Sequence, residues 1–207
     1  MQKNKINCIN NPINPKKRVL FLGYNKKETK IIDHLIKHKC YIDHTKDKID
    51  FQEDYDFLIS FGYKHILKKK VIEKVNCPIF NLHISFLPYN RGAHPNFWSF
   101  YDKTPSGVSI HIIDEGIDTG PIIYQKYVNF DNGEKTFANT YLTLIKEIEC
   151  LFIEKIENFI NERWESRPQK GNGTFHNMKD LPSNFSGWDS IISDEIKRLY
   201  REGINYE

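Results

Sequence analysis

Residues 54–88, DYDFLISFGYKHILKKKVIEKVNCPIFNLHISFLP, alternate between two kinds of pattern. DYDFLISFG (54–62) and PIFNLHISFLP (78–88) are short apolar runs with Gly or Pro at their ends, which is typical of buried strands. Between them, HILKKKVIEKV (65–75) predicts a helix. A strand, a helix and a second strand in this order indicate a βαβ unit with parallel strands.

The same alternation continues on both sides of this unit. Upstream, RVLFLG (18–23) and CYID (40–43) predict strands around a helix in KKETKIIDHLIKHK (26–39). Downstream, the expected elements are a helix in NFWSFYD (96–102), strands GVSIHIID (107–114) and PIIYQKYV (121–128), a long amphipathic helix over 137–163, and an amphipathic stretch DSIISDEIKRLY (189–200). The pattern predicts an α/β fold with a mostly parallel central sheet flanked by helices.

Composition limits the class of protein and its organisation. The 207 residues suffice for one core. We expect an Asn-, Lys- and Pro-rich N-terminal arm over 1–16, one α/β domain over 17–167, and a C-terminal extension over 168–207 that packs on that domain. A net charge of +3 does not indicate a nucleic-acid binder. The chain shows no signal peptide and no apolar run of about 18 residues, so we expect no membrane insertion.

Cysteine spacing and missing motifs exclude several chemistries. The four cysteines lie far apart without a CxxC pair, which favours reduced thiols in the cytoplasm. The chain has no GxGxxG, GxxxxGK[ST] or GxSxG segment. Asp118-Thr119-Gly120 matches the DTG of aspartic proteases, but those enzymes need an all-β barrel and a second aspartate. His83, His94 and His111 match no short zinc motif, so we predict no metal.

Polar residues gather where two predicted strands end. Asn81 and His83 are two positions apart in an extended segment, so both point to the same face. Asp118 lies in a loop flanked by glycines after another strand, where it can approach them. An Asn, a His and an Asp in one cleft suit transfer of an acyl group to an amine, through oxyanion stabilisation and proton transfer. On residue types alone, ordinary roles as core histidine, turn former and loop cap remain the alternative.

Two separated motifs resemble a known family. Asn81-Leu82-His83-Ile84-Ser85-Phe86-Leu87-Pro88, followed by Gly107-Val108-Ser109 and Asp118-Thr119-Gly120, is similar to the signature of the 10-formyltetrahydrofolate-dependent formyltransferases. The resemblance implies a Rossmann-like formyltransferase fold with 10-formyltetrahydrofolate as co-substrate. It also implies that Asn81, His83 and Asp118 are the catalytic residues.

Further segments are most similar to the branch that acts on dTDP-linked amino sugars; they are SFGYKHIL (60–67), YNRGAHPNFWSF (89–100), IDEGIDTGPII (113–123) and GTFHNMKDLP (173–182). Methionyl-tRNA formyltransferases carry an extra C-terminal barrel, and the low net charge here offers little for tRNA. The resemblance implies formylation of dTDP-4-amino-4,6-dideoxyglucose for O-antigen or another surface polysaccharide, with the 3-amino isomer as the next choice. A formyltetrahydrofolate hydrolase and a non-catalytic folate-binding homologue are the alternatives. The family and the long amphipathic helix also suggest a homodimer.

The remaining site residues follow from chemistry and position. A sugar-linked diphosphate needs cations and hydroxyls, which Arg91, Tyr63 and Lys64 can offer, although Lys64 equally suits a solvated surface. Gly92 would let the backbone approach a ligand closely. In the family the pterin slot lies beside the motif strands, which implies a lining of Ile113, Asp114, Gly116 and Ile117. We expect Phe97 and Trp98 to pack the helix on which they lie.

Overall fold

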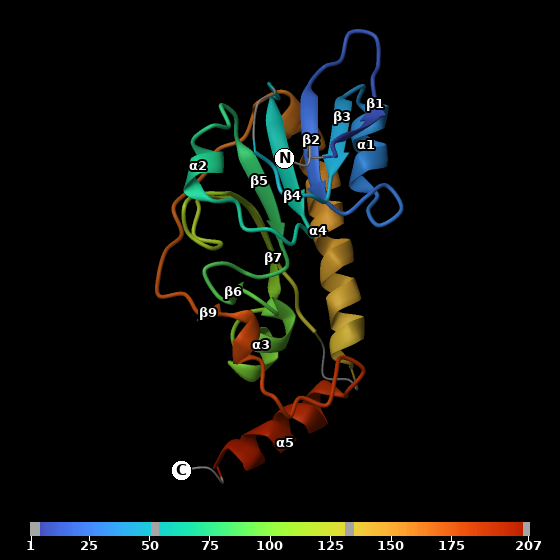
Figure 1. Ribbon diagram of the computed structural model, residues 1–207. Helices are drawn as coiled ribbons and strands as arrows, with labels where there is room; N and C mark the ends of the chain where they lie inside the picture. Colours follow the sequence, from blue (N-terminus) through green and yellow to red (C-terminus); the bar gives the residue numbers. More distant parts are fainter. Residues whose placement is uncertain (1–4, 51–53, 131–134, 205–207) are drawn as a thin grey trace.

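A computed structural model describes residues 5–50, 54–130 and 135–204. One large sheet forms its centre (Figure 1), in the order β1-β3-β2-β4-β5-β7-β8. These strands are β1 (Asn7–Asn10), β2 (Arg18–Gly23), β3 (Tyr41–Thr45), β4 (Phe57–Phe61), β5 (Ile79–His83), β7 (Gly107–Ile112) and β8 (Ile122–Tyr127). A second, two-stranded sheet joins β6 (Arg91–Gly92) to β9 (Phe175–His176).

The helices are α1 (Ile31–Lys37), α2 (Lys69–Ile72), α3 (Pro95–Tyr101), α4 (Phe137–Ile160) and α5 (Ile192–Ile204), with a short 3-10 helix η1 (Met178–Asp180). Within the described residues, none of these helices combines the length and the apolar character needed to cross a bilayer.

Strand direction confirms the predicted sheet. Strands β3, β2, β4 and β5 pair in parallel. Strand β7 is antiparallel to both β5 and β8, so β8 runs in the same direction as the central strands. Only β1 and β7 run the opposite way among the strands of the large sheet in the described chain. The α/β fold with a mostly parallel sheet is therefore as the alternating pattern indicated.

Helices cover both faces of the sheet, which explains why β2 is a continuous apolar run. Val19 and Phe21 face α1 and α4 on one side. Leu20 and Leu22 face the opposite side, where Val71 of α2 packs against them. A strand covered on both faces has no solvent side to carry polar residues, so the apolar–polar alternation of an exposed sheet is absent from RVLFLG.

Three helices are shorter than the sequence predicted. Helix α1 begins at Ile31, because the preceding turn closes on itself: the Asn25 side chain accepts from Lys27 N at 2.8 Å and Glu28 N donates to Asn25 O at 2.9 Å. Such local Asx bonding competes with helix. Helix α2 covers only Lys69–Ile72, after Lys68 in an extended conformation. The long helix also stops earlier than expected, at Ile160.

Both terminal regions join the domain. Strand β1 lies inside the stretch expected to be an arm and pairs with β3 at the sheet edge. In the C-terminal region, β9 pairs with β6, and α5 packs against α3 at the lower end of the molecule in Figure 1. Phe97 and Trp98 are buried in the apolar cluster between these helices, so their expected packing role is confirmed. The other buried members of this cluster are Phe137, Ile192 and Leu199.

Candidate active site

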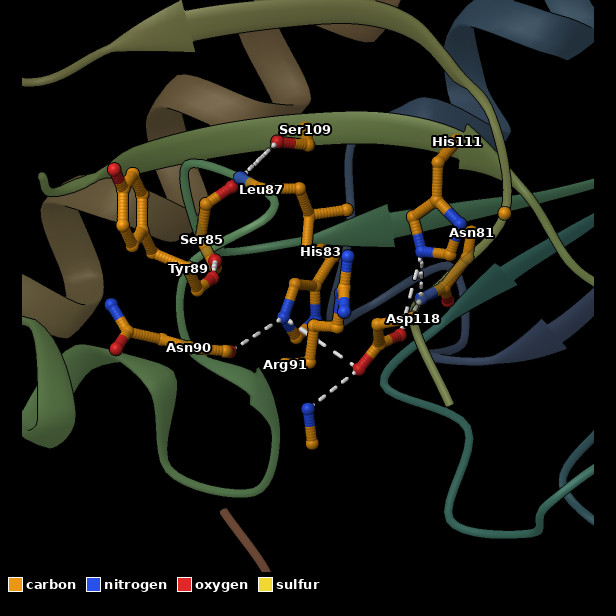
Figure 2. A network of polar contacts seen from close by, with 12 residues as sticks. Asn81, His83, Ser85, Leu87, Tyr89, Asn90, Arg91, Ser109, His111 and Asp118 are labelled. Carbon is orange, nitrogen blue, oxygen red and sulfur yellow. Dashed lines mark hydrogen bonds and ion pairs between the residues drawn. The ribbon is translucent and has the colours of Figure 1, made fainter. Parts of the chain in front are cut away.

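The polar residues of the two motifs meet at one end of the sheet (Figure 2). Asn81 and His83 lie in the last three residues of β5. On the neighbouring strand β7, His111 pairs directly with Asn81 in the sheet register. Asp118 comes from the loop between β7 and β8 and points back toward all three side chains. The structure therefore brings together the Asn, the His and the Asp that the sequence placed in one cleft.

The Asp118 carboxylate is the centre of this group. Its Oδ1 accepts a hydrogen bond from Asn81 Nδ2 at 3.1 Å and lies 3.4 Å from His111 Nε2. Its Oδ2 accepts from Gly92 N at 2.9 Å and lies 3.7 Å from His83 Nε2. The side chains of Asp118 and His83 are only 13% and 10% exposed, so their interaction is little screened by water.

Burial and charge set the protonation states. Burial lowers the pKa of His83, and the neighbouring charge of Asp118 only partly opposes this. Burial alone would raise the pKa of Asp118, but His83, His111 and the Gly92 N–H lower it well below its usual range. At neutral pH the site therefore holds a neutral imidazole beside an ionised carboxylate. His83 Nε2 lies 3.2 Å from Asn90 O, and since a carbonyl only accepts, this nitrogen carries the proton.

His111 belongs to the group, although the sequence analysis considered it only as a zinc ligand and rejected that role. Its Nδ1 donates to Ile112 O at 2.9 Å, and its Nε2 lies 3.1 Å from Asn81 Nδ2 and 3.4 Å from Asp118 Oδ1. The Asn81 amide nitrogen is thus held between His111 and Asp118. Donation from Asn81 to an oxyanion requires the amide to exchange one of these partners. The sequence could have revealed this role only through the pairing of β5 with β7, because it is their register that places His111 opposite Asn81.

The loop that carries Asp118 has an unusual backbone. Asp118 itself has a φ of +53°, in the left-handed region that non-glycine residues seldom adopt. Gly120 cannot be replaced without movement, because an added Cβ would lie 1.8 Å from Ile112 O. Asp114 organises the turn, since its Oδ1 accepts from Thr119 Oγ1 at 2.6 Å and from Gly116 N at 3.1 Å. The Asp118-Thr119-Gly120 segment forms a tight turn that brings the chain back toward β5.

A cavity of about 710 Å³ opens beside this loop; it is called the larger cavity below. Asn81 and Asp118 form part of its wall. All four residues expected at a pterin slot also line it, as do three of the expected diphosphate contacts; together these are Ile113, Asp114, Gly116, Ile117, Tyr63, Lys64 and Gly92.

The sequence did not predict the remaining wall of the larger cavity. Phe175 and Met178 come from the C-terminal region, and Ile66 comes from the loop before α2. These three side chains are 45%, 70% and 74% exposed, so the cavity has an apolar mouth. Residues 65–67 were expected to be helical, but they lie in this wall, and α2 begins only at Lys69, after Lys68 in an extended conformation.

Three expected ligand contacts have protein partners. The Tyr63 hydroxyl donates to Asp47 O at 2.7 Å. Gly92 approaches the backbone of β9, where an added Cβ would lie 2.3 Å from His176 O, and its N–H serves Asp118. Arg91 is not among the residues that line the larger cavity, and two of its guanidinium nitrogens donate to Gln169 Oε1, at 3.1 and 2.6 Å. Contacts of these residues with a diphosphate stay predictions.

A second hollow of about 430 Å³, called the smaller pocket below, lies where the loop after β5 meets α3 and α4. Its lining is mostly apolar and aromatic: Ile84, His94, Pro95, Asn96, Phe137, Ala138, Tyr141, Leu142 and Trp188. The rings of His94 and Trp188 are 5.2 Å apart. Gly92 and Ala93 line the larger cavity while His94 and Pro95 line the smaller pocket, so one short loop separates the two spaces.

In the described part of the chain, no three His, Cys, Asp or Glu side chains are grouped so as to hold a metal ion. The site therefore consists of an Asn–His–Asp group, a second histidine and two hollows.

A family model described as "Formyl transferase" matches residues 19–152. The chain belongs to this family. The resemblance recognised in the two motifs is thereby confirmed. The matched segment includes Asn81, His83 and Asp118 but ends before the C-terminal region that completes the walls of both hollows.

Individual relatives of this formyl transferase fall into two groups. A solved structure of the formyltransferase PseJ from Anoxybacillus kamchatkensis, in complex with UDP-4,6-dideoxy-4-formamido-L-AltNAc and tetrahydrofolate, is similar with a TM-score of 0.78 and 36% identity, over 85% of this chain and 96% of that chain. A dTDP-4-amino-4,6-dideoxyglucose formyltransferase of Mycobacterium bovis is 30% identical over 129 residues, which are 62% of this chain and 54% of the relative.

A methionyl-tRNA formyltransferase of Thermodesulfovibrio yellowstonii represents the other group. It is 34% identical over 122 residues, which are 58% of this chain and 39% of the relative. The chain thus spans about half, or less, of the length of the curated relatives it matches.

Proposed function

We propose that this formyl transferase is a sugar N-formyltransferase, which moves the formyl group of 10-formyltetrahydrofolate to the amine of a nucleotide-linked 4-amino-4,6-dideoxyhexose. One observation carries the proposal. The Asn81–His83–Asp118 group lies at the boundary of two separate hollows, one bordered by Asn81 and Asp118 and the other by Ile84, the residue next to His83. Substrates bound in the two hollows would both lie beside this group.

The larger cavity suits the folate. A reduced pterin is flat, carries hydrogen-bonding edges and continues into an apolar aromatic ring. The backbone and side chain of the 113–118 loop can meet the polar edges, and Ile66, Phe175 and Met178 give the mouth an apolar surface. The volume of about 710 Å³ lies within the usual range of small-molecule sites.

The smaller pocket suits part of the acceptor. Its aromatic rings can pack against a nucleobase or against the apolar face of a dideoxysugar. Asn96 lies in the same wall, where its Nδ2 donates to Phe137 O at 2.8 Å and its Oδ1 is buried without a hydrogen-bond partner among the described residues. A formyltetrahydrofolate hydrolase would need no such second pocket, so this feature favours an amine acceptor over water.

The transfer requires one bond to form and one to break. The acceptor amine attacks the formyl carbon of the co-substrate, and the bond from this carbon to the folate N10 then breaks. The amine gives up one proton, and N10 receives one. Neutral His83 is poised to take the proton from the amine and return it to N10, while ionised Asp118 stabilises the imidazolium formed in between.

The names of the relatives guide the choice of sugar. The PseJ complex contains a 4,6-dideoxy sugar with nitrogen at position 4, and the name of the mycobacterial relative specifies another such sugar. The alignment with PseJ covers nearly all of that chain at higher identity, so we place a UDP-linked 4-amino-4,6-dideoxy sugar first and dTDP-4-amino-4,6-dideoxyglucose second. The dTDP-linked 3-amino isomer comes third.

The cellular setting belongs to the proposal as well. The four cysteines are all free, which favours the reducing cytoplasm, and the product would serve O-antigen or another surface polysaccharide. We retain the homodimer as a prediction, which light scattering of the purified protein can test.

The test is an end-point assay with 10-formyltetrahydrofolate and a panel of acceptors, with products identified by mass. The panel contains UDP- and dTDP-linked 4-amino-4,6-dideoxy sugars, the dTDP-linked 3-amino isomer and a control without acceptor. An acceptor that gains 28 Da, about the mass of CO, in a reaction with wild-type protein but not with an Asp118→Asn variant supports the proposal. Deformylation of folate at an equal rate in the control would instead identify a hydrolase.

A further inference from the structure

Gln169 makes four hydrogen bonds that tie together segments distant in the sequence. Its Nε2 donates to Asp118 O and to Gly120 O, each at 2.8 Å. Its Oε1 accepts from Nε and Nη2 of Arg91, at 3.1 and 2.6 Å. Gln169 lies beyond the segment that the family model matches and was not among the expected site residues.

The orientation of the Gln169 amide follows from its partners. Carbonyl oxygens only accept and a guanidinium only donates, so Nε2 must face the loop and Oε1 must face Arg91. Among uncharged side chains, only the carboxamides of Gln and Asn offer two donors and a strong acceptor on one planar group. The amide therefore links the backbone of the 118–120 loop to β6.

The same strand also holds the Asp118 side chain. Gly92, the neighbour of Arg91 in β6, donates its N–H to Asp118 Oδ2 at 2.9 Å. Asp118 is thus held twice: at its carbonyl through Gln169 and at its carboxylate by Gly92. A left-handed residue other than glycine costs roughly 1 kcal/mol and persists only where its surroundings impose it. With a φ of +53°, Asp118 needs such support.

We propose that Gln169 is a positioning residue for the reaction: by fixing the backbone at Asp118 and Gly120 against Arg91, it directs the Asp118 carboxylate at His83. The inference rests on the proposed formyl transfer. Gln169 itself contacts neither His83 nor Asn81 and lies outside the walls of both hollows. Its effect on the rate must therefore pass through Asp118.

Gln169→Glu tests this assignment. The substitution keeps the size and the acceptor for Arg91 but places a carboxylate oxygen against two carbonyl oxygens, so the loop is pushed away from β6. A displacement of about 1 Å at a catalytic group costs on the order of 100-fold in rate. We expect kcat to fall by about that factor while KM for both substrates stays within about threefold. Gln169→Met, which removes all four hydrogen bonds without adding charge, should lower kcat in the same way.

Asn10→Asp is the matched control, because Asn10 Nδ2 also donates to a backbone carbonyl, Cys40 O at 2.7 Å, but lies in β1. It should keep the wild-type kcat. Either of two results would overturn the proposal: a kcat within twofold of wild type in both Gln169 variants, or a parallel loss of kcat, substrate binding and Tm that indicates general unfolding.

A readout without substrate separates this inference from the proposed function. Asp118 and His111 are the ionisable groups that face His83, and the charge of Asp118 raises the His83 pKa. NMR titration of His83 in Gln169→Met, which adds no charge of its own, should therefore give a lower pKa than in wild type. An unchanged titration would refute the positioning role, whereas wild-type protein that forms no formylated sugar would refute only the reaction.

Discussion

Asp118→Asn removes one charge from the site with almost no change in shape. The carboxylate now accepts from Asn81 Nδ2 and Gly92 N and lies 3.7 Å from His83 Nε2. In the resting site His83 is neutral, because burial lowers its pKa. In the proposed transfer it becomes an imidazolium only as it takes the proton from the attacking amine. The attraction between Asp118 and His83 is therefore gained on the way to the transition state, which is the condition for it to accelerate the reaction.

The size of the effect follows from this geometry. Two unit charges about 4 Å apart attract by about 4 kcal/mol at an effective dielectric constant near 20. Each 1.36 kcal/mol corresponds to a factor of ten in rate. The loss of this attraction should lower kcat by about 10³-fold, within the range of general acid–base effects. Binding of folate should change much less, because the variant keeps the volume of the cavity.

The assay compares single-turnover formyl transfer by wild type, Asp118→Asn and Asp43→Asn. Asp43 is a suitable control, since it is 4% exposed and accepts from the Tyr55 hydroxyl at 2.8 Å on β3. Its variant should lose stability but keep its rate. A rate for Asp118→Asn within about tenfold of wild type, with intact folding, would show that the charge does not stabilise the transition state as argued.

Two further predictions concern pH and stability. Since burial lowers the pKa of His83 from 6.5, the ring should titrate with a midpoint below pH 6.5 when its NMR signals are followed in the substrate-free protein; a midpoint above 7 would contradict this. Ser109, fully buried, donates to Ser85 O at 2.6 Å and accepts from Leu87 N at 3.1 Å. Ser109→Ala should therefore cost about 2 kcal/mol and lower Tm by about 4–8 °C in thermal unfolding, and an unchanged Tm would argue against these bonds.

Local patterns predicted the strands and the position of the Asn–His–Asp group. Asn81 and His83 share a face because side chains alternate along a strand, a property that needs no tertiary information. Asp118 could be placed near them because glycines on both sides of it allow a tight return of the chain. The long helix α4 could be predicted equally well, since its apolar residues recur over many turns.

The remaining features depend on contacts between distant segments. His111 belongs to the site only because β5 and β7 pair antiparallel in a register that places it opposite Asn81. Arg91 looked free to bind phosphate because its partner Gln169 lies 78 positions later in the chain. Ile66 fits a helical pattern in the sequence, but in the structure it lies in the cavity wall, before the start of α2. None of these outcomes is encoded in the neighbouring residues alone.

The polar residues of the site and several wall residues of the two hollows come from different parts of the chain. Asn81, His83 and Asp118 lie on β5 and on the loop after β7, whereas Phe175, Met178 and Trp188 complete the walls of the two hollows. These three wall residues can change without touching the β5–β7 pair. A new acceptor can therefore be accommodated by changing Trp188 in the smaller pocket, whereas Gln169, in the same terminal region, is constrained because it holds the Asp118 backbone.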